Sequence, residues 1–171
     1  MTGAAPSFTA QRVAMHRAAH QLLDNPQVFQ DPLAVAILGE EVARLKSQLD
    51  RFDTAGARQI RAFVIAKSRY AEDELNVAIA RGATQYVILG AGLDTYAYRS
   101  TQSRLRVFEV DYPASQVWKR TQLETAGIGF HLPWPSCQLT SRNKRSAQPS
   151  KHRAFSGTRS ASFRGLASHP I

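Results

Sequence analysis

Residues 85–99 read QYVILGAGLDTYAYR, and this stretch decides the fold. A short apolar run at residues 86–89 ends at Gly-Ala-Gly, and the carboxylate of Asp94 follows directly. Short apolar runs bounded by glycine are typical of buried β-strands. Glycines after a strand allow the backbone to approach a ligand closely, because no Cβ stands in the way. The stretch therefore predicts a strand that leads into a ligand-binding turn.

The neighbouring segments predict the fold around this turn. Residues 58–81 carry the strongest helical pattern of the chain and stop before Gly82. A second strand is predicted at residues 105–110 and ends at Asp111, and a helix at residues 113–125 follows it. This order of elements indicates an α/β domain with a parallel sheet. An acid at the end of the second strand is suited to accept hydrogen bonds from the ribose hydroxyls of an adenosine-containing cofactor.

Two classes of cofactor compete for the turn at residues 90–94. A dinucleotide site requires G-x-G-x-x-G, and Thr95 stands where the third glycine would be. The carboxylate of Asp94 would also repel phosphate groups. S-adenosylmethionine carries no phosphate and offers an amino group and a sulfonium, so the sequence favours methyl transfer over hydride transfer. An Asp94 that only caps the turn after Gly92 is an equal alternative.

The N-terminal segment is expected to form two helices. Residues 8–24 are amphipathic, with Thr9 as the N-cap. The pair Asp31-Pro32 is expected to start a second helix that continues to residue 49, with Asp31 as its N-cap.

Several polar and aromatic side chains are interpreted as structural. His16 and His20 stand one helical turn apart without a carboxylate or cysteine partner, and we expect them at the surface. Tyr96 and Tyr98 are expected to pack in the core. A solvated face of the helix at residues 58–81 is expected to carry Arg69, Glu72 and Asp73.

Composition narrows the class of protein. The chain has 171 residues, a net charge of +9 and one cysteine, Cys137, which excludes an internal disulfide framework. No signal peptide and no apolar run of about 20 residues is present in the sequence, so we expect a soluble, cytoplasmic protein without a membrane partner. Residues 1–124 hold 15 Lys and Arg against 13 acids, whereas residues 125–171 hold seven basic residues and no acid. The net positive charge therefore belongs mainly to residues 125–171. This distribution disfavours nucleic acid as a partner of residues 1–124.

The helical and strand patterns stop near Phe130. Residues 130–171 contain eight serines and four prolines but no acid and no sustained apolar period. Such a composition buries too little apolar surface to fold. Two interpretations stay open, a disordered basic tail and a reading frame that departs from its ancestral course near residue 130. We expect residues 130–171 to lack stable structure in either case.

The sequence resembles the leucine carboxyl methyltransferase-like family of S-adenosylmethionine-dependent methyltransferases, in particular its bacterial and mycobacterial members. The resemblance covers about residues 8–128 and is carried by FQDPLA (29–34), SRYAEDEL (68–75), QYVILGAGLDTYAYR (85–99) and VFEVDYPASQVWKR (107–120). It implies the N-terminal part of a class I, Rossmann-like methyltransferase fold with an N-terminal helical cap. It also implies that the fold continues past this chain, which would leave the first strand as an exposed apolar edge.

The resemblance implies roles for particular residues. Gly90 and Gly92 would lie beside the methionine part of the cofactor, and Asp111 would hold the ribose hydroxyls, with Glu109 as the second candidate. Lys67 stands where the family usually has an arginine and would face the cofactor carboxylate without the bidentate fork. No catalytic base and no metal site is predicted.

These expectations divide the chain and define its function. Residues 1–57 form the helical cap, residues 58–129 a partial Rossmann-like cofactor-binding domain, and residues 130–171 the basic tail. The expected reaction is transfer of a methyl group from S-adenosylmethionine to a carboxylate or hydroxyl oxygen of an unknown small molecule, impaired by truncation after about residue 129. The alternatives are a non-catalytic remnant and a nucleic-acid-binding protein that uses the tail.

Overall fold

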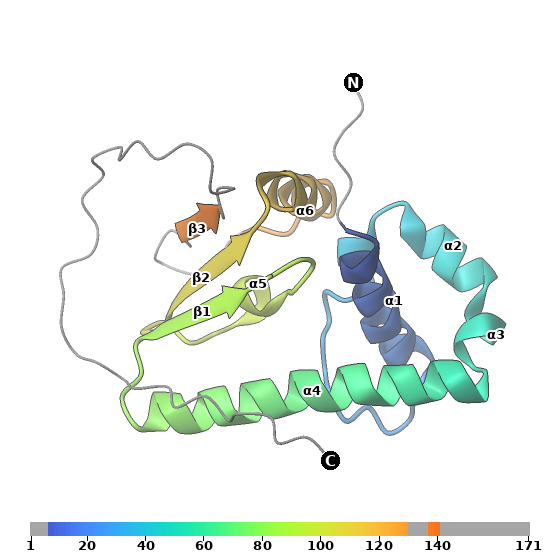
Figure 1. The fold of residues 1–171 in the computed structure, drawn as a ribbon, viewed down its shortest axis with the longest axis horizontal. Helices are drawn as coiled ribbons and strands as arrows, with labels where there is room; N and C mark the ends of the chain where they lie inside the picture. Colours follow the sequence, from blue (N-terminus) through green and yellow to red (C-terminus); the bar gives the residue numbers. More distant parts are fainter. Residues whose placement is uncertain (1–6, 130–136, 141–171) are drawn as a thin grey trace, which may run out of the picture.

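A computed structural model of the chain describes residues 7–129 and 137–140 (Figure 1). The first half is helical and consists of α1 (Phe8–Leu23), the 3₁₀ helix η1 (Ala36–Leu38), α2 (Glu41–Ser47), α3 (Leu49–Phe52) and α4 (Ala55–Ala80). The second half alternates strands and helices, namely β1 (Gln85–Leu89), α5 (Tyr96–Arg99), β2 (Arg106–Asp111), α6 (Pro113–Thr125) and β3 (Cys137–Thr140).

The described strands form one parallel sheet in the order β1-β2-β3. Leu89 of β1 is paired with Val110 of β2, so the two strands end at the same edge of the sheet. The chain between them passes through the short helix α5. The prediction of a parallel sheet in which the first strand leads into the glycine turn is confirmed.

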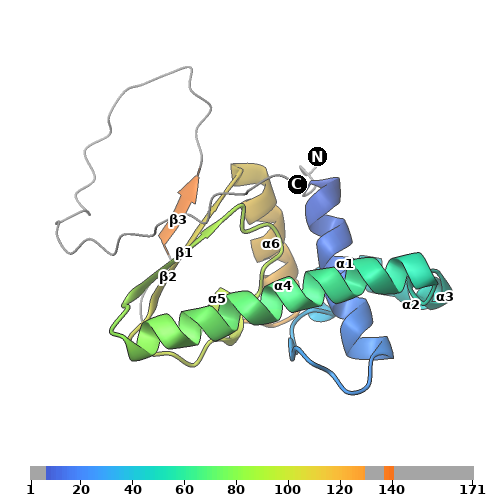
Figure 2. The ribbon, with the colours of Figure 1, turned by 60° about the horizontal axis from the view of Figure 1, so that its bottom comes forward.

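The long helix α4 runs along the length of the molecule. It begins at Ala55, three residues before the predicted start, because the Thr54 side chain caps it by accepting a hydrogen bond from the Ala57 amide at 3.3 Å. Gly82, with φ 97°, ends it as predicted. Figures 1 and 2 show that α4 runs along both the sheet and the helices α1–α3, and thereby joins the two halves.

The single helix predicted over residues 32–49 is wrong. The structure has turns from Pro32, then η1, and then the separate helices α2 and α3. Gly39 adopts φ 56° between η1 and α2, a conformation that an α-helix does not contain. The apolar positions of this segment fit a helical period, but they pack as short turns against α1 and α6.

The first helix agrees with its predicted range but not with its predicted cap. Ser7 and not Thr9 is the N-cap of α1, since its hydroxyl accepts a hydrogen bond from the Ala10 amide at 3.2 Å. The buried face of α1 carries small side chains, including Ala14 and Ala18, and these allow close approach of α4 and η1.

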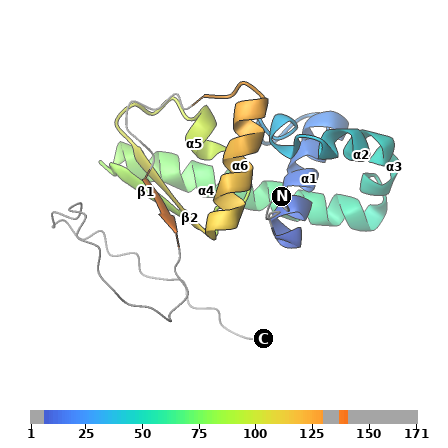
Figure 3. The same ribbon diagram turned by 90° about the horizontal axis from the view of Figure 1, so that it is seen from above.

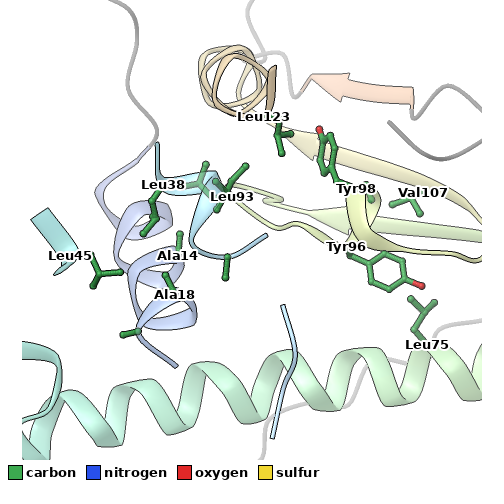
Figure 4. Packing of buried hydrophobic residues seen from close by; sticks show 14 of the residues in the cluster. Ala14, Ala18, Leu38, Leu45, Leu75, Leu93, Tyr96, Tyr98, Val107 and Leu123 are labelled. Atoms are coloured by element: carbon green, nitrogen blue, oxygen red, sulfur yellow. The ribbon is translucent and has the colours of Figure 1, made fainter. Parts of the chain in front are cut away.

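The hydrophobic core spans the helical half and the sheet (Figure 4). Tyr96 and Tyr98 of α5 are buried in it, as expected. Leu75 of α4 lies beside Tyr96, and Leu123 of α6 lies beside Tyr98. The core members are Ala14, Ala18, Ala19, Ala34, Ile37, Leu38, Leu45, Leu75, Leu93, Tyr96, Ala97, Tyr98, Leu105, Val107 and Leu123.

The strand β3 lies inside the segment that we expected to lack structure. Residues 137–140 pair in parallel with β2, so the expectation was wrong for these four residues. The free edge of β2 offers backbone donors and acceptors to any extended segment. Such pairing needs no apolar pattern of side chains, so the sequence carries no sign of this strand. The rest of residues 130–171 lies outside the described residues.

The strand β1 occupies an edge of the sheet, as the resemblance implied. Val87 is 49% exposed and Leu89 is 77% exposed, so one apolar face of the strand is open. Seen from above, α6 packs beside the sheet and the helices α1–α3 lie together at the far end of the molecule (Figure 3). Among the described residues, no helix is both long and apolar enough to cross a membrane.

Candidate functional site

The glycine turn lies at the carboxyl edge of the sheet. Gly90 has φ 65° and Gly92 has φ 48°, which a residue with a Cβ adopts only with strain. The amides of Gly90 and Ala91 donate to the Val110 carbonyl of β2 at 2.8 and 3.2 Å. The turn is therefore fixed to the end of β2.

Gly92 is also the point where the turn meets α1. A Cβ at this position would lie 3.1 Å from the Cβ of Ala10, so a larger side chain at either residue would push α1 away from the turn. Small residues are needed at both positions, and the N-terminal helix thereby forms one wall of the glycine turn.

Asp111 ends β2 beside the turn. One carboxylate oxygen accepts a hydrogen bond from the Gly92 amide, and the other accepts one from the Tyr112 amide at 2.6 Å. The structure thus brings Asp111, Gly90 and Gly92 together at one edge of the sheet, where open parallel sheets bind ligands.

Asp94 makes the local capping contact that one of its two alternatives expects, and its role toward a cofactor stays a prediction. Its Oδ1 accepts a hydrogen bond from the Tyr96 amide at 2.8 Å, which is a capping contact at the start of α5. Its Oδ2 lies 3.8 Å from Nη1 of Arg17, and 34% of the side chain is exposed. One oxygen is therefore engaged in local structure, and the other still presents negative charge at the site.

A buried polar network supports the turn from behind. Arg17 of α1 donates to Asp31 and, at 2.6 Å, to the Thr95 hydroxyl, and a further guanidinium nitrogen donates to the Leu93 carbonyl at 3.4 Å. The Thr95 hydroxyl donates to Asp31 at 2.8 Å. Arg17, Asp31 and Thr95 are all buried, so the network links α1 and the segment after it to the turn in a region of low dielectric.

Arg99 extends this network to α4. Its Nε donates to Thr95 at 3.1 Å, and its guanidinium forms a two-point contact with the carboxylate of Glu72, one bond at 3.0 Å. Glu72 therefore does not belong to the solvated face, as we had expected. Arg69 and Asp73 do lie exposed, paired with one another at 2.8 Å.

Glu109, the second candidate for the ribose, lies in the interface between β2 and α6. Its carboxylate is 1% exposed and accepts a hydrogen bond from Nζ of Lys119 at 2.6 Å, and that lysine is also 1% exposed. Burial raises the pKa of Glu109 above its ordinary value, and the positive charge of Lys119 opposes this rise. Such a contact docks α6 onto the sheet.

Lys67 is not joined to the turn by any contact among the described residues. It lies on an exposed face of α4. Its predicted role toward a cofactor carboxylate remains a prediction.

The two histidines of α1 are buried, which corrects the expectation of surface residues. His20 does have a carboxylate partner, because its Nδ1 lies 2.7 Å from Asp24. His16 packs edge-on against the ring of Phe52, with the ring centroids 5.4 Å apart. The contact of His16 with α3 and the contact of His20 with the residue after α1 explain why these two polar side chains are buried.

Sequence reasoning also missed Arg17, which the amphipathic pattern of residues 8–24 did not single out. A signal was present, because Arg17 shares a helical face with Ala10 and Ala14. A charged residue among small ones indicates close packing against a partner of opposite charge, and Asp31 supplies that charge.

Comparison with known proteins identifies the family. The sequence profile described as leucine carboxyl methyltransferase matches residues 10–154, and so extends beyond residue 128, where the motif-based resemblance ended. A Bacillus subtilis protein named "Putative S-adenosyl-L-methionine-dependent methyltransferase YktD" is 33% identical over 145 residues, which cover 71% of this chain and 48% of the relative. A Frankia alni protein named "Putative S-adenosyl-L-methionine-dependent methyltransferase FRAAL3718" is 36% identical over 159 residues, which cover 82% and 54%. This chain spans about half the length of the curated relatives that it matches, and it belongs to the leucine carboxyl methyltransferase family.

Proposed function

We propose that this chain forms the S-adenosyl-L-methionine-binding part of a methyltransferase. The observation that carries the proposal is the placement of the glycine turn and Asp111 at the same edge of a parallel sheet, in a chain of this family. We further propose that residues 58–129 belong to a class I, Rossmann-like domain and that residues 1–57 form its helical cap. The contact between Ala10 and Gly92 supports a cap that lies against the cofactor site.

The residues of the site suit different parts of this cofactor. Asp111 would accept hydrogen bonds from the two ribose hydroxyls, in place of the amides that it now accepts from. Gly90 and Gly92 would allow the methionine part to approach the backbone. The exposed oxygen of Asp94 would face the cofactor's amino group, and Lys67 would face its carboxylate.

The reaction that this arrangement would serve is methyl transfer to oxygen. The cofactor supplies a methyl group on a positively charged sulfur, which an acceptor oxygen displaces in line. The contribution of the chain is to hold the cofactor in position, since positioning of the reacting groups lowers the barrier of such displacements. The acceptor is proposed to be a small molecule with a carboxylate or hydroxyl group.

A titration of the 171-residue chain tests the proposal. Isothermal titration calorimetry with S-adenosyl-L-homocysteine should show saturable binding, and NAD⁺ should bind more weakly because its phosphates approach Asp94. Tighter binding of NAD⁺, or no binding of S-adenosyl-L-homocysteine to a chain whose circular dichroism shows the helical fold, would refute it. The hypothesis of nucleic-acid binding through the basic tail stays untested, because the seven basic residues lie outside the described residues.

A further inference from the structure

A cavity lies between the first four α-helices, on the other side of α1 from the glycine turn. Whereas Ala10 faces Gly92, the neighbouring residues Gln11, Arg12 and Met15 line this cavity. Its free volume is about 410 Å³, within the range of small-molecule sites. We call it the N-terminal pocket, and Figure 3 shows the helices α1–α4 that enclose it at one end of the molecule.

The charge that lines the N-terminal pocket is entirely positive. Arg12 of α1, Arg44 of α2 and Arg51 of α3 contribute to its wall, and none of the described residues adds a carboxylate. Arg44 has a partner outside the lining, Glu41, at 3.4 Å. Within residues 7–129 and 137–140, Arg51 has neither an ion pair nor a side-chain hydrogen bond. Three guanidinium groups without a lining carboxylate favour an anion, because their forks match a carboxylate or a similar planar oxyanion.

His16 adds a buried polar group to the same wall. The residue is 5% exposed, and its Nδ1 has no hydrogen-bond partner in the described part of the chain. Burial, and then the charges of Arg12 and Arg61, lower the pKa of His16 below its ordinary value, so the imidazole is neutral at pH 7.

The rest of the wall is apolar apart from the amide side chains of Gln11 and Gln48, and it is partly open. Met15 and Phe52 line the interior, and the outer wall carries Phe8, which is 71% exposed, and Ile60. The Arg12 guanidinium lies 5.6 Å from the centre of the Phe8 ring, so positive charge and apolar surface adjoin one another. A simple inorganic anion would leave this apolar wall in water, whereas an anion with a hydrocarbon body would cover it.

We propose that the N-terminal pocket binds a small organic carboxylate with an apolar body, with Arg12 and Arg51 holding the carboxylate and Phe8, Met15 and Ile60 contacting the hydrocarbon part. The site is separate from the glycine turn and does not depend on the proposed function, because α1 stands between the two.

Calorimetry on the complete 171-residue chain with three probes tests this site. Octanoate combines charge and apolar body, octan-1-ol has the body without the charge, and acetate has the charge without the body. Octanoate should bind in a saturable manner with one site per chain, and the other two probes should each bind at least about tenfold more weakly. Octan-1-ol binding as tightly as octanoate, or an absence of octanoate binding to the folded chain, overturns the proposal.

Substitutions then locate the binding. The double variant Arg12→Gln/Arg51→Gln should weaken octanoate binding by about tenfold or more. The matched control Arg58→Gln/Arg104→Gln removes the same charge from two exposed arginines that do not line the pocket, and it should leave the affinity within about twofold. A third variant, Arg12→Lys/Arg51→Lys, keeps the charge but loses the forks and should bind with intermediate affinity.

Two results of the substitution experiment would show that octanoate does not bind in the N-terminal pocket. Binding at the open apolar face of β1, around Val87 and Leu89, would be equally insensitive to both double glutamine variants. A general effect of net charge would weaken octanoate binding to the same extent in both double glutamine variants. Either result overturns the proposal, provided that circular dichroism and the thermal midpoint show that each variant is folded.

Discussion

Arg17 of α1 and Asp31, in the segment that follows, form an ion pair that is buried beneath the glycine turn, and both side chains also contact Thr95. The pair connects the helical half of the chain to the loop that the proposed function assigns to the cofactor. Since charges in such a place are stable only when paired, the position of the turn depends on residues far away in the sequence.

Removing one partner of this pair should destabilise the fold strongly. Asp31→Ala leaves the Arg17 guanidinium buried beside an empty site, and loss of one partner of a buried pair costs about 3–5 kcal/mol. The double variant Arg17→Met/Asp31→Leu should be less costly than Asp31→Ala, since it removes both charges of the pair, and the nearby Arg99 keeps its partner Glu72. The free energy of unfolding in urea measures both effects.

The exposed pair between Arg69 and Asp73 of α4 provides the control. The two side chains are 2.8 Å apart but 58% and 50% exposed, so Asp73→Ala should have only a small effect. If Asp31→Ala destabilises the chain no more than Asp73→Ala does, the network has no structural role.

The comparison between sequence and structure separates local signals from long-range ones. The helix α4, the strands β1 and β2 and the glycine turn were predictable because each is encoded within about 25 neighbouring residues. The burial of Arg17 had a local signal in its small neighbours on the helix, but its partners were not predictable, because they are 14 and 78 residues away. Gly39 was a local signal for a break in the helix predicted over residues 32–49, but the helical period of the apolar residues around it favoured one continuous helix. The contact of Lys67 with a cofactor carboxylate, which the resemblance implied, stays a prediction, because the exposed Lys67 side chain has no hydrogen bond or ion pair to the turn among the described residues.

Lys119→Met should make the stability of the chain depend on pH. The substitution leaves Glu109 buried without a counter-charge, so its pKa, already raised by burial, should rise further. A carboxyl whose pKa is higher in the folded than in the unfolded chain binds more protons when folded, so the free energy of unfolding falls as pH rises above the ordinary value. Urea unfolding should show this variant more stable at pH 5 than at pH 7, relative to the parent.

Adding Glu109→Gln to Lys119→Met should remove this dependence. The amide keeps the shape of the side chain but does not titrate. Should the double variant retain the pH slope of Lys119→Met, the slope would come from another group and the assignment to Glu109 would fail.

His16 should make the chain less stable in mild acid. Its pKa lies below the ordinary value of 6.5, because the ring is buried and Arg12 and Arg61 lie near it. The folded chain therefore binds fewer protons here than the unfolded chain, and the free energy of unfolding falls as pH decreases below 6.5. The loss between pH 7.5 and pH 5.5 should be smaller in His16→Gln than in the parent. Equal slopes in the two proteins would contradict the prediction.

Asp111→Ala tests the ribose assignment. Hydrogen bonds to a charged acceptor contribute about 1.5–3 kcal/mol, so the loss should weaken S-adenosyl-L-homocysteine binding by roughly 10- to 100-fold. Asp111→Asn keeps one oxygen acceptor and should lose less. Glu109→Ala is a poor comparison, since Glu109 is paired with Lys119 in the core and its removal should destabilise the fold instead.

Weaker binding alone would not prove contact with the ribose, because Asp111 also accepts the Gly92 amide and its loss could loosen the turn. A second ligand separates the two effects. The 2′,3′-dideoxy analogue of S-adenosyl-L-homocysteine lacks both hydroxyls, so the parent chain should bind it less tightly than the natural compound. In Asp111→Ala this preference should disappear, whereas a loosened turn would weaken both ligands equally and preserve it. If calorimetry finds the same ratio of affinities in parent and variant, Asp111 does not receive the ribose hydroxyls, and its role is to hold the glycine turn against β2.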